Sequence, residues 1–266
     1  MRAKLPITLM LLVFSCGNAS AGVVLTFSTT DLETKKTTPM TIYADPDKMA
    51  IANDGETMVY REAEKKFVII NPARKNYTEV TLETIQQLTG QMSAMQKQMQ
   101  EQMAAMPPAQ RAQMEAMMAG LGMPGAGAAA KKPQVNYAKQ GPAKRVANIA
   151  CDMYGKTVDG SHDEDLCIAR IAATGITAAD IKVLDSLGAF VDQLTSMPMI
   201  PRGSEYSWAA MNKAVGFTGI PLETTDLEGG KPISVTTIQK IERAAIPAAT
   251  FEIPAGFARQ TMPAAH

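Results

Sequence analysis

MTIYADPDKMAIANDGETMVYREAEKKFVIINPARKNYTEV, from Met40 to Val80, is the stretch of sequence that decides the fold. Turn signals recur in it about every nine residues, and short segments between them alternate apolar and polar side chains. These signals lie at 45–47, 53–55, 62–65 and 71–73. Phe67-Val68-Ile69-Ile70 is apolar on both faces, which is typical of a central strand covered on both sides. Short strands joined by tight turns predict an antiparallel sheet that begins at Val23.

The remainder of the chain predicts further strands and two helices. Strand character returns near 135–137 and over 146–158, 166–171 and 220–246, the last divided by Gly229-Gly230. Thr177 and Asp180 have the spacing of a capping box, which predicts the start of a helix. Its apolar residues repeat at helical spacing: Ile181, Leu184, Leu187, Val191 and Leu194. A short helix is expected over 208–214, and ordered structure is expected to end at 254–256. Together these patterns predict the α+β class.

A methionine-rich helix follows the first group of strands. Thr81 or Thr84 could cap its start, and Pro107-Pro108 ends or kinks it. Seven apolar residues share one face of this helix: Ile85, Leu88, Met92, Met95, Met99, Met103 and Met106. The five methionines fall within an arc of roughly 80° at 100° per residue. Such a soft face is expected to lie on a sheet, a partner or a lipid-like ligand.

The chain is expected to have one domain with a leader. Residues 1–21 are predicted to be a signal peptide and residues 22–266 a single half-barrel-like domain. A Met-rich helical and flexible insertion occupies about 82–133. Within it, a second short helical run is expected from 108 to 119. The Gly- and Ala-rich stretch from 120 to 133 is expected to be a flexible connector.

The leader has the three parts of a secretory signal. Arg2 and Lys4 are basic, Ile7 to Phe14 is a short apolar core, and Ala19-Ser20-Ala21 forms a cleavage site. A competing interpretation makes Cys16 a lipidated cysteine, although Phe14 fits such a site poorly. No later apolar run in the sequence is long enough to cross a membrane. We therefore expect an exported, periplasmic protein with no transmembrane segment in the mature chain.

Charge and cysteine content narrow the function classes. The sequence has 26 Lys and Arg against 26 Asp and Glu, and this balance argues against a nucleic-acid partner. After export, Cys151 and Cys167 remain, and an even pair in an oxidising compartment predicts a disulfide. Asp159-Gly160, a strong hairpin dipeptide, lies midway between them. A disulfide that closes this loop would stabilise the folded chain by about 3 kcal/mol. The rival interpretation, a metal or redox thiol pair, lacks CxxC spacing.

No recognisable catalytic motif is present. The histidines are His162 and His266, and neither lies in a GxSxG, HExxH, P-loop or dinucleotide motif. We therefore predict that the protein is not an enzyme and has no cofactor. An acidic run, Asp159, Asp163, Glu164 and Asp165, could hold calcium but lacks the EF-hand order of ligands. We therefore favour the interpretation that these acidic residues form a solvated hairpin tip.

The methionines allow a copper interpretation as well. Thioethers are soft ligands suited to Cu(I), and the helical spacing of Met95, Met99 and Met103 would let their sulfurs converge. The apolar stripe continues, however, through Ile85 and Leu88, which cannot ligate a metal. The periodicity therefore favours packing or apolar binding, and no metal site is predicted.

Several stretches carry a resemblance to a known family: 47–51, 58–60, 67–72 with Tyr77, 146–154 and 251–257. The family is a bacterial exported group of unknown function related to the lipoprotein-carrier (LolA-like) half-barrel, which usually has Gly where this chain has Asn148. The resemblance implies a curved antiparallel β-sheet with helices in or over its concave face, and a cavity suited to acyl chains.

The leading functional hypothesis is a non-enzymatic periplasmic protein that binds a lipid, an acyl chain or another apolar ligand, or an envelope protein. A Met-rich Cu(I)-binding protein is the second hypothesis. A structural or interaction protein whose cavity is filled by its own helices is the third.

Overall fold

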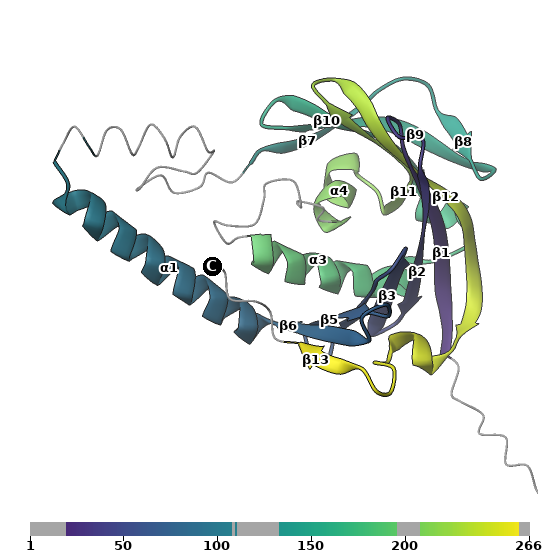
Figure 1. Cartoon of the computed structure of the whole chain (residues 1–266). Coiled ribbons are helices and arrows are strands. Elements are labelled where there is room, and N and C mark those ends of the chain that lie inside the picture. Colours follow the sequence, from purple (N-terminus) through teal and green to yellow (C-terminus); the bar gives the residue numbers. More distant parts are fainter. Residues whose placement is uncertain (1–19, 108–109, 111–132, 196–207, 261–266) are drawn as a thin grey trace, which may run out of the picture.

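The strands of this protein form one open, curved sheet (Figure 1). The structure is a computed structural model that describes residues 20–107, 110, 133–195 and 208–260. Within these residues the strand order is β13-β6-β5-β4-β3-β2-β1-β12-β11-β10-β9-β7, and β8 pairs with β9 off this path. All neighbouring strands are antiparallel except β13 and β6. The predicted antiparallel sheet is therefore confirmed, and its curvature fits a half-barrel.

The first six strands are β1 (Ser20–Asp31), β2 (Thr37–Asp45), β3 (Lys48–Asn53), β4 (Thr57–Arg61), β5 (Lys66–Asn71) and β6 (Asn76–Thr81). After α1 (Leu82–Ala105) come β7 (Val135–Lys139), β8 (Lys144–Val146), β9 (Ile149–Val158) and β10 (Ser161–Arg170). Helices α3 (Lys182–Thr195) and α4 (Trp208–Val215) precede β11 (Gly219–Glu228), β12 (Lys231–Ile246) and β13 (Ala258–Gln260).

Local sequence explains most of these boundaries. The turns of the first meander lie where the sequence predicts them, and Gly229-Gly230 separates β11 from β12. Asp159 and Gly160 join β9 to β10 with φ angles of 51° and 87°, the left-handed conformation that a tight two-residue hairpin requires. Asn148, in the β8–β9 turn, has a φ of 64°. Asn tolerates this conformation better than most residues.

The central strands bury side chains on both faces. On the concave face Tyr60 and Phe67 contact Phe190 of α3, with their ring centroids 5.8 and 5.3 Å from that of Phe190. On the opposite face Val68 and Ile70 pack in a cluster with Phe251 from the segment after β12. The prediction that residues 67–70 form a central strand covered on both sides is therefore confirmed.

The helix predicted from Thr177 begins as a 3-10 turn, Ala178–Ile181, and continues as α3. The Thr177 backbone N–H and hydroxyl both donate to Asp180, at 2.6 and 2.7 Å, and Arg243 of β12 donates to the same carboxylate at 2.8 Å. Partial burial opposes ionisation of Asp180, but these donors outweigh it and lower the pKa of the carboxyl. The cap and its ion pair thereby connect the start of α3 to the sheet.

The prediction that ordered structure ends at 254–256 is wrong. Ala258 to Gln260 form β13, which pairs in parallel with β6, and Arg259 lies 2.8 Å from the Glu79 carboxylate. Three exposed residues have no hydrophobic period, so the sequence gives no signal for this strand. Its formation depends on the edge of β6, which offers unpaired backbone groups to the returning chain.

Several predictions lie outside the described residues. These include the leader up to residue 19 with Cys16, the helical run within 111–119 and the connector from 120 to 132. β1 begins at Ser20, two residues before the expected mature terminus at Gly22.

Candidate functional site

Helix α1 is anchored at its first turn. Thr81 is the cap, because the Thr84 N–H donates to its hydroxyl at 3.1 Å. Ile85 is buried in a cluster with Tyr60 of β4 and with Val183 and Phe190 of α3. The start of the methionine helix is therefore part of the concave-face core.

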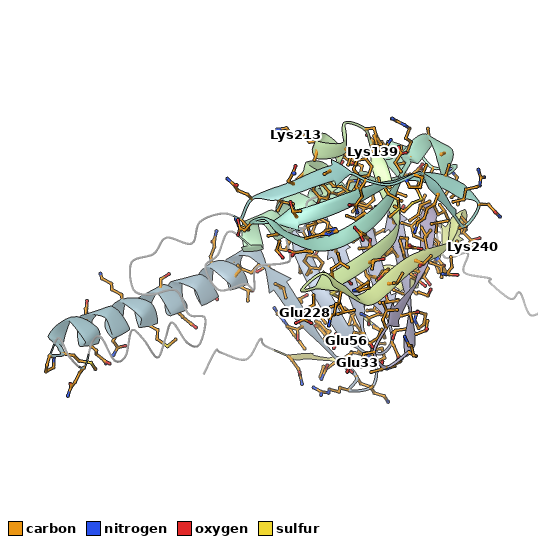
Figure 2. The ribbon with its side chains drawn as sticks, turned by 90° about the horizontal axis from the view of Figure 1, so that it is seen from above. Glu33, Glu56, Lys139, Lys213, Glu228 and Lys240 are labelled. Atoms are coloured by element: carbon orange, nitrogen blue, oxygen red, sulfur yellow. A yellow bond between two sulfur atoms is a disulfide. The ribbon has the colours of Figure 1, made fainter. Side chains whose placement is uncertain are left out.

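Beyond its first turns α1 projects away from the half-barrel, as two perpendicular views show (Figures 1 and 2). Its main contact with a neighbouring strand is with β6. Met95, near the middle of the helix, is 57% exposed, whereas Met106 is half-buried. The structure therefore places Ile85 and Met95 in different environments. Four members of the predicted face have backbones on the helix but side chains outside the described set: Leu88, Met92, Met99 and Met103.

Helices α3 and α4 lie within the curve of the sheet (Figure 1). Val183 and Phe190 of α3 are buried against β2 to β4. Met211 of α4 is buried with Tyr154 and Leu166 of the β9–β10 hairpin. These helix side chains cover apolar residues of the sheet. A ligand inside the half-barrel would therefore not reach those residues.

A buried ion pair lies on the β9–β10 hairpin. Lys156 Nζ is 2.8 Å from Glu164 Oε1, and the two side chains are 2% and 8% exposed. The residues stand directly opposite each other in the ladder, and Tyr137 of β7 is the next partner of Lys156. Burial and the Glu164 charge raise the pKa of Tyr137 to about 12, so the phenol stays neutral at physiological pH.

The interpretation of the acidic run as a solvated tip is wrong for Glu164. An extra residue in β10 shifts the hairpin register between His162 and Glu164, so that Glu164 faces Lys156. The signal available in the sequence is a Lys and a Glu on opposite sides of Asp159-Gly160. Using that signal requires the position of the bulge, which local pattern does not reveal.

The predicted disulfide is confirmed. Cys151 and Cys167 are bonded, with Cα atoms 5.3 Å apart. Cys167 stands opposite Met153 in the ladder, so Cys151 is its diagonal neighbour on the same face. Both cysteines belong to a buried cluster that includes Ile220 and Val146. The bond therefore links β9 and β10 inside the core.

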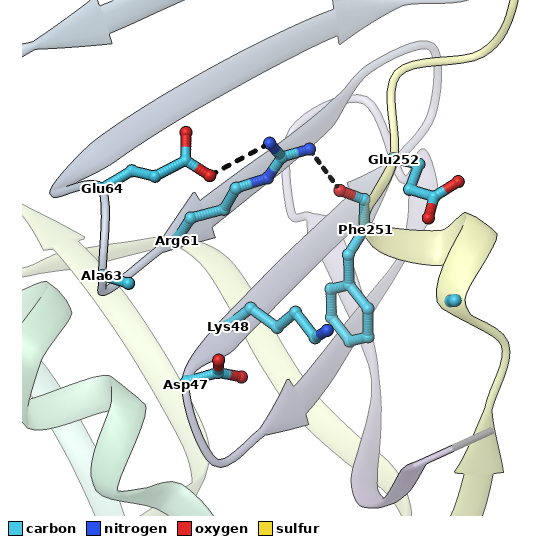
Figure 3. A pocket seen from close by; sticks show the side chains of 8 residues that line it. Asp47, Lys48, Arg61, Ala63, Glu64, Phe251 and Glu252 are labelled. Carbon is cyan, nitrogen blue, oxygen red and sulfur yellow. Dashed lines mark hydrogen bonds and ion pairs between the residues drawn. The ribbon is translucent and has the colours of Figure 1, made fainter. Parts of the chain in front are cut away.

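A small polar pocket of about 370 Å³ lies where the C-terminal segment meets the sheet (Figure 3). It is lined by Asp47, Lys48, Arg61, Ala63, Glu64, Ala248, Phe251 and Glu252. Its cationic groups already have partners within the chain. Arg61 donates to the Phe251 carbonyl oxygen at 2.9 Å and to Glu64 at 3.3 Å, and Lys48 lies over the Phe251 ring. These contacts are structural, because they hold the C-terminal segment against β3 and β4.

The described residues give no sign of a metal centre or a membrane span. Among them, no three His, Cys, Asp or Glu side chains gather closely enough to hold a metal ion. None of the helices in the same ranges combines the length and apolar character that crossing a bilayer requires.

Comparison with known proteins gives likenesses in structure only. No family model matches the chain, and no curated protein matches it either. An uncharacterized conserved protein from Thermus thermophilus is 11% identical with a TM-score of 0.44, over 92% of each chain. MucB is 11% identical with a TM-score of 0.34, over 87% of this chain and 56% of MucB. The matching chain of the Pseudomonas aeruginosa MucA/MucB complex is 10% identical with a TM-score of 0.36. The match covers 90% of this chain and 57% of that chain.

At these identities and TM-scores, none of the three assigns a family or an activity to this chain. The resemblance to the lipoprotein-carrier half-barrel therefore stays a prediction, supported in its broad outline by the open curved sheet.

Proposed function

We propose that this chain is a non-enzymatic, exported binding protein that holds an apolar ligand or an envelope partner on helix α1, beside the half-barrel. The observation that carries this proposal is the position of α1. Its first turn is anchored by Ile85, while Met95 is exposed on the part that leaves the sheet. A flexible thioether side chain adapts to varied apolar surfaces at small cost.

Two further observations support the proposal. The apolar residues of α3 and α4 already cover parts of the concave face, which favours binding beside the half-barrel over binding deep inside it. The buried disulfide between Cys151 and Cys167 is typical of proteins that fold in an oxidising compartment, and a periplasmic location fits that compartment.

A dye-binding experiment tests the proposal. The chain is expected to increase the fluorescence of an anilinonaphthalenesulfonate dye, and palmitate is expected to displace that dye. Met95→Glu should weaken dye binding about tenfold, since burying one Met side chain contributes roughly 1.5–3 kcal/mol. Ala94→Glu is the matched control, because Ala94 is an exposed neighbour off the apolar stripe. Equal dye binding by the two variants would contradict the proposal.

Copper binding is the competing function, and a triple substitution separates it. Changing Met95, Met99 and Met103 to Leu keeps apolar volume and usually costs less than about 1.5 kcal/mol per site, while it removes three thioethers. The triple variant is expected to keep its fold and its dye binding. The Cu(I) affinity of both proteins is measured by competition against a chelator. Tight Cu(I) binding by the original chain that disappears in the triple variant would replace apolar binding by copper binding as the function.

A further inference from the structure

The large apolar side chains of α1 from Ile85 to Met99 follow a heptad repeat. With Ile85 at position a, the a positions within α1 are Ile85, Met92 and Met99, and the d positions are Leu88, Met95 and Gln102. Five of these six positions are apolar, and the structure joins 82–105 in one helix. A repeat of 3.5 residues is the signature of a helix that pairs with another helix.

The narrow width of the stripe distinguishes a helix partner from a lipid surface. Helices that lie on membranes have a broad apolar face and a polar face rich in Lys and Arg. From Ile85 onward, the large apolar residues of α1 other than Met103 occupy a and d, which is the narrower seam of a coiled coil. The basic residue between 82 and 105 is Lys97, at the outward position f. The helix is therefore suited to another helix more than to a bilayer.

The residues that flank the seam are compatible with an identical partner helix. Charges at positions e and g normally select one partner over another. Here the e positions are Thr89, Gln96 and Met103, and the g positions are Gln91, Gln98 and Ala105, so none is charged. An identical helix meets no like-charge repulsion at this seam. Because each Gln amide both donates and accepts hydrogen bonds, a Gln-lined flank is also complementary to itself.

The stability of α1 points in the same direction. Helices in proteins owe most of their stability to packing of an amphipathic face, and Gly in a helix interior costs about 1 kcal/mol relative to Ala. α1 carries Gly90 in its interior, projects beyond the sheet and exposes Met95. A second helix against the seam would bury Met95 and add packing to this part of α1.

We propose that the partner of α1 is the α1 helix of a second copy of this chain, paired along the seam from Leu88 to Gln102. This inference rests on the proposed role of α1 as an apolar recognition helix, and it specifies what that helix recognises. The seam is about 22 Å long at 1.5 Å per residue. An antiparallel pair would place the two half-barrels at opposite ends of the paired helices.

Sedimentation velocity of the full chain across a wide range of concentrations tests this pairing. The original chain is expected to form a dimer of twice the monomer mass. Met95→Glu should weaken dimerisation at least about tenfold, because it places a charge at a core d position. Ala94→Glu, at the outward position c, should leave it within about twofold. Circular dichroism of both variants checks that helix content is unchanged.

A second substitution should act in the opposite direction. Gln102→Leu replaces the polar d residue by the residue that d positions prefer, and it is expected to tighten dimerisation about tenfold. Gln87→Leu, an exposed residue at position c, is the control that adds the same apolar volume outside the seam. Equal tightening by both variants would overturn the proposed seam.

The outcomes separate this inference from the proposed function. A chain that stays monomeric at every concentration overturns self-pairing. If that monomer still loses dye binding through Met95→Glu and keeps it through Ala94→Glu, the apolar recognition role of α1 stands and its partner is another molecule. If Met95→Glu alters neither dimerisation nor dye binding, both proposals are overturned.

Discussion

Replacing Lys156 by Met is expected to lower the free energy of unfolding by about 3–5 kcal/mol. The Lys156 ammonium lies 2.8 Å from the Glu164 carboxylate, and both side chains are almost fully buried. Met fills a similar volume, so the main change is a buried carboxylate without the ammonium that faces it. Such a charge is costly to keep out of water. Urea denaturation followed by circular dichroism measures the loss.

Two further variants identify the cause of that loss. Lys139 and Asp152 form an ion pair at 3.1 Å on the β7–β9 ladder, but Lys139 is 60% exposed. Lys139→Met should therefore cost less than about 1 kcal/mol. Lys156→Met combined with Glu164→Leu should recover much of the single-variant loss, because no buried charge remains. If the double variant is as unstable as Lys156→Met, packing and not charge explains the effect.

Removal of the disulfide is expected to lower the free energy of unfolding by about 3 kcal/mol. Cys151 and Cys167 are 16 residues apart, and opening a loop of that size restores this much conformational entropy to the unfolded chain. The double variant Cys151→Ala with Cys167→Ala leaves no buried polar group behind. Its stability relative to the oxidised parent is measured by urea denaturation without reductant.

The same measurement in reductant provides the control. Reducing the parent protein should lower its stability by a similar amount, whereas the double Ala variant should not respond. A parent protein whose unfolding is the same with and without reductant would show that the bond between β9 and β10 contributes little to stability.

The local features of this fold could be predicted from the sequence. Turn residues divide the first meander into short strands, and Asp159-Gly160 and Gly229-Gly230 define two hairpins. The helix that starts near Thr177 follows from its capping residues and apolar spacing. These features depend on contacts between residues close in sequence, which is why composition and period are enough to reveal them. The pairing of Cys151 with Cys167 belongs with them, because a single hairpin brings the two residues together.

Only the tertiary structure decided the contacts between distant segments. β1 pairs with β12, which joins the two ends of the chain into one sheet, and β13 returns to the edge of β6. The Lys156–Glu164 pair depends on a bulge, and the separation of Ile85 from Met95 depends on where α1 leaves the sheet. The sequence by itself determined that α1 has an apolar face. Which parts of that face are covered depends on distant strands and helices, because burial is a property of the packed molecule and not of the spacing along the chain.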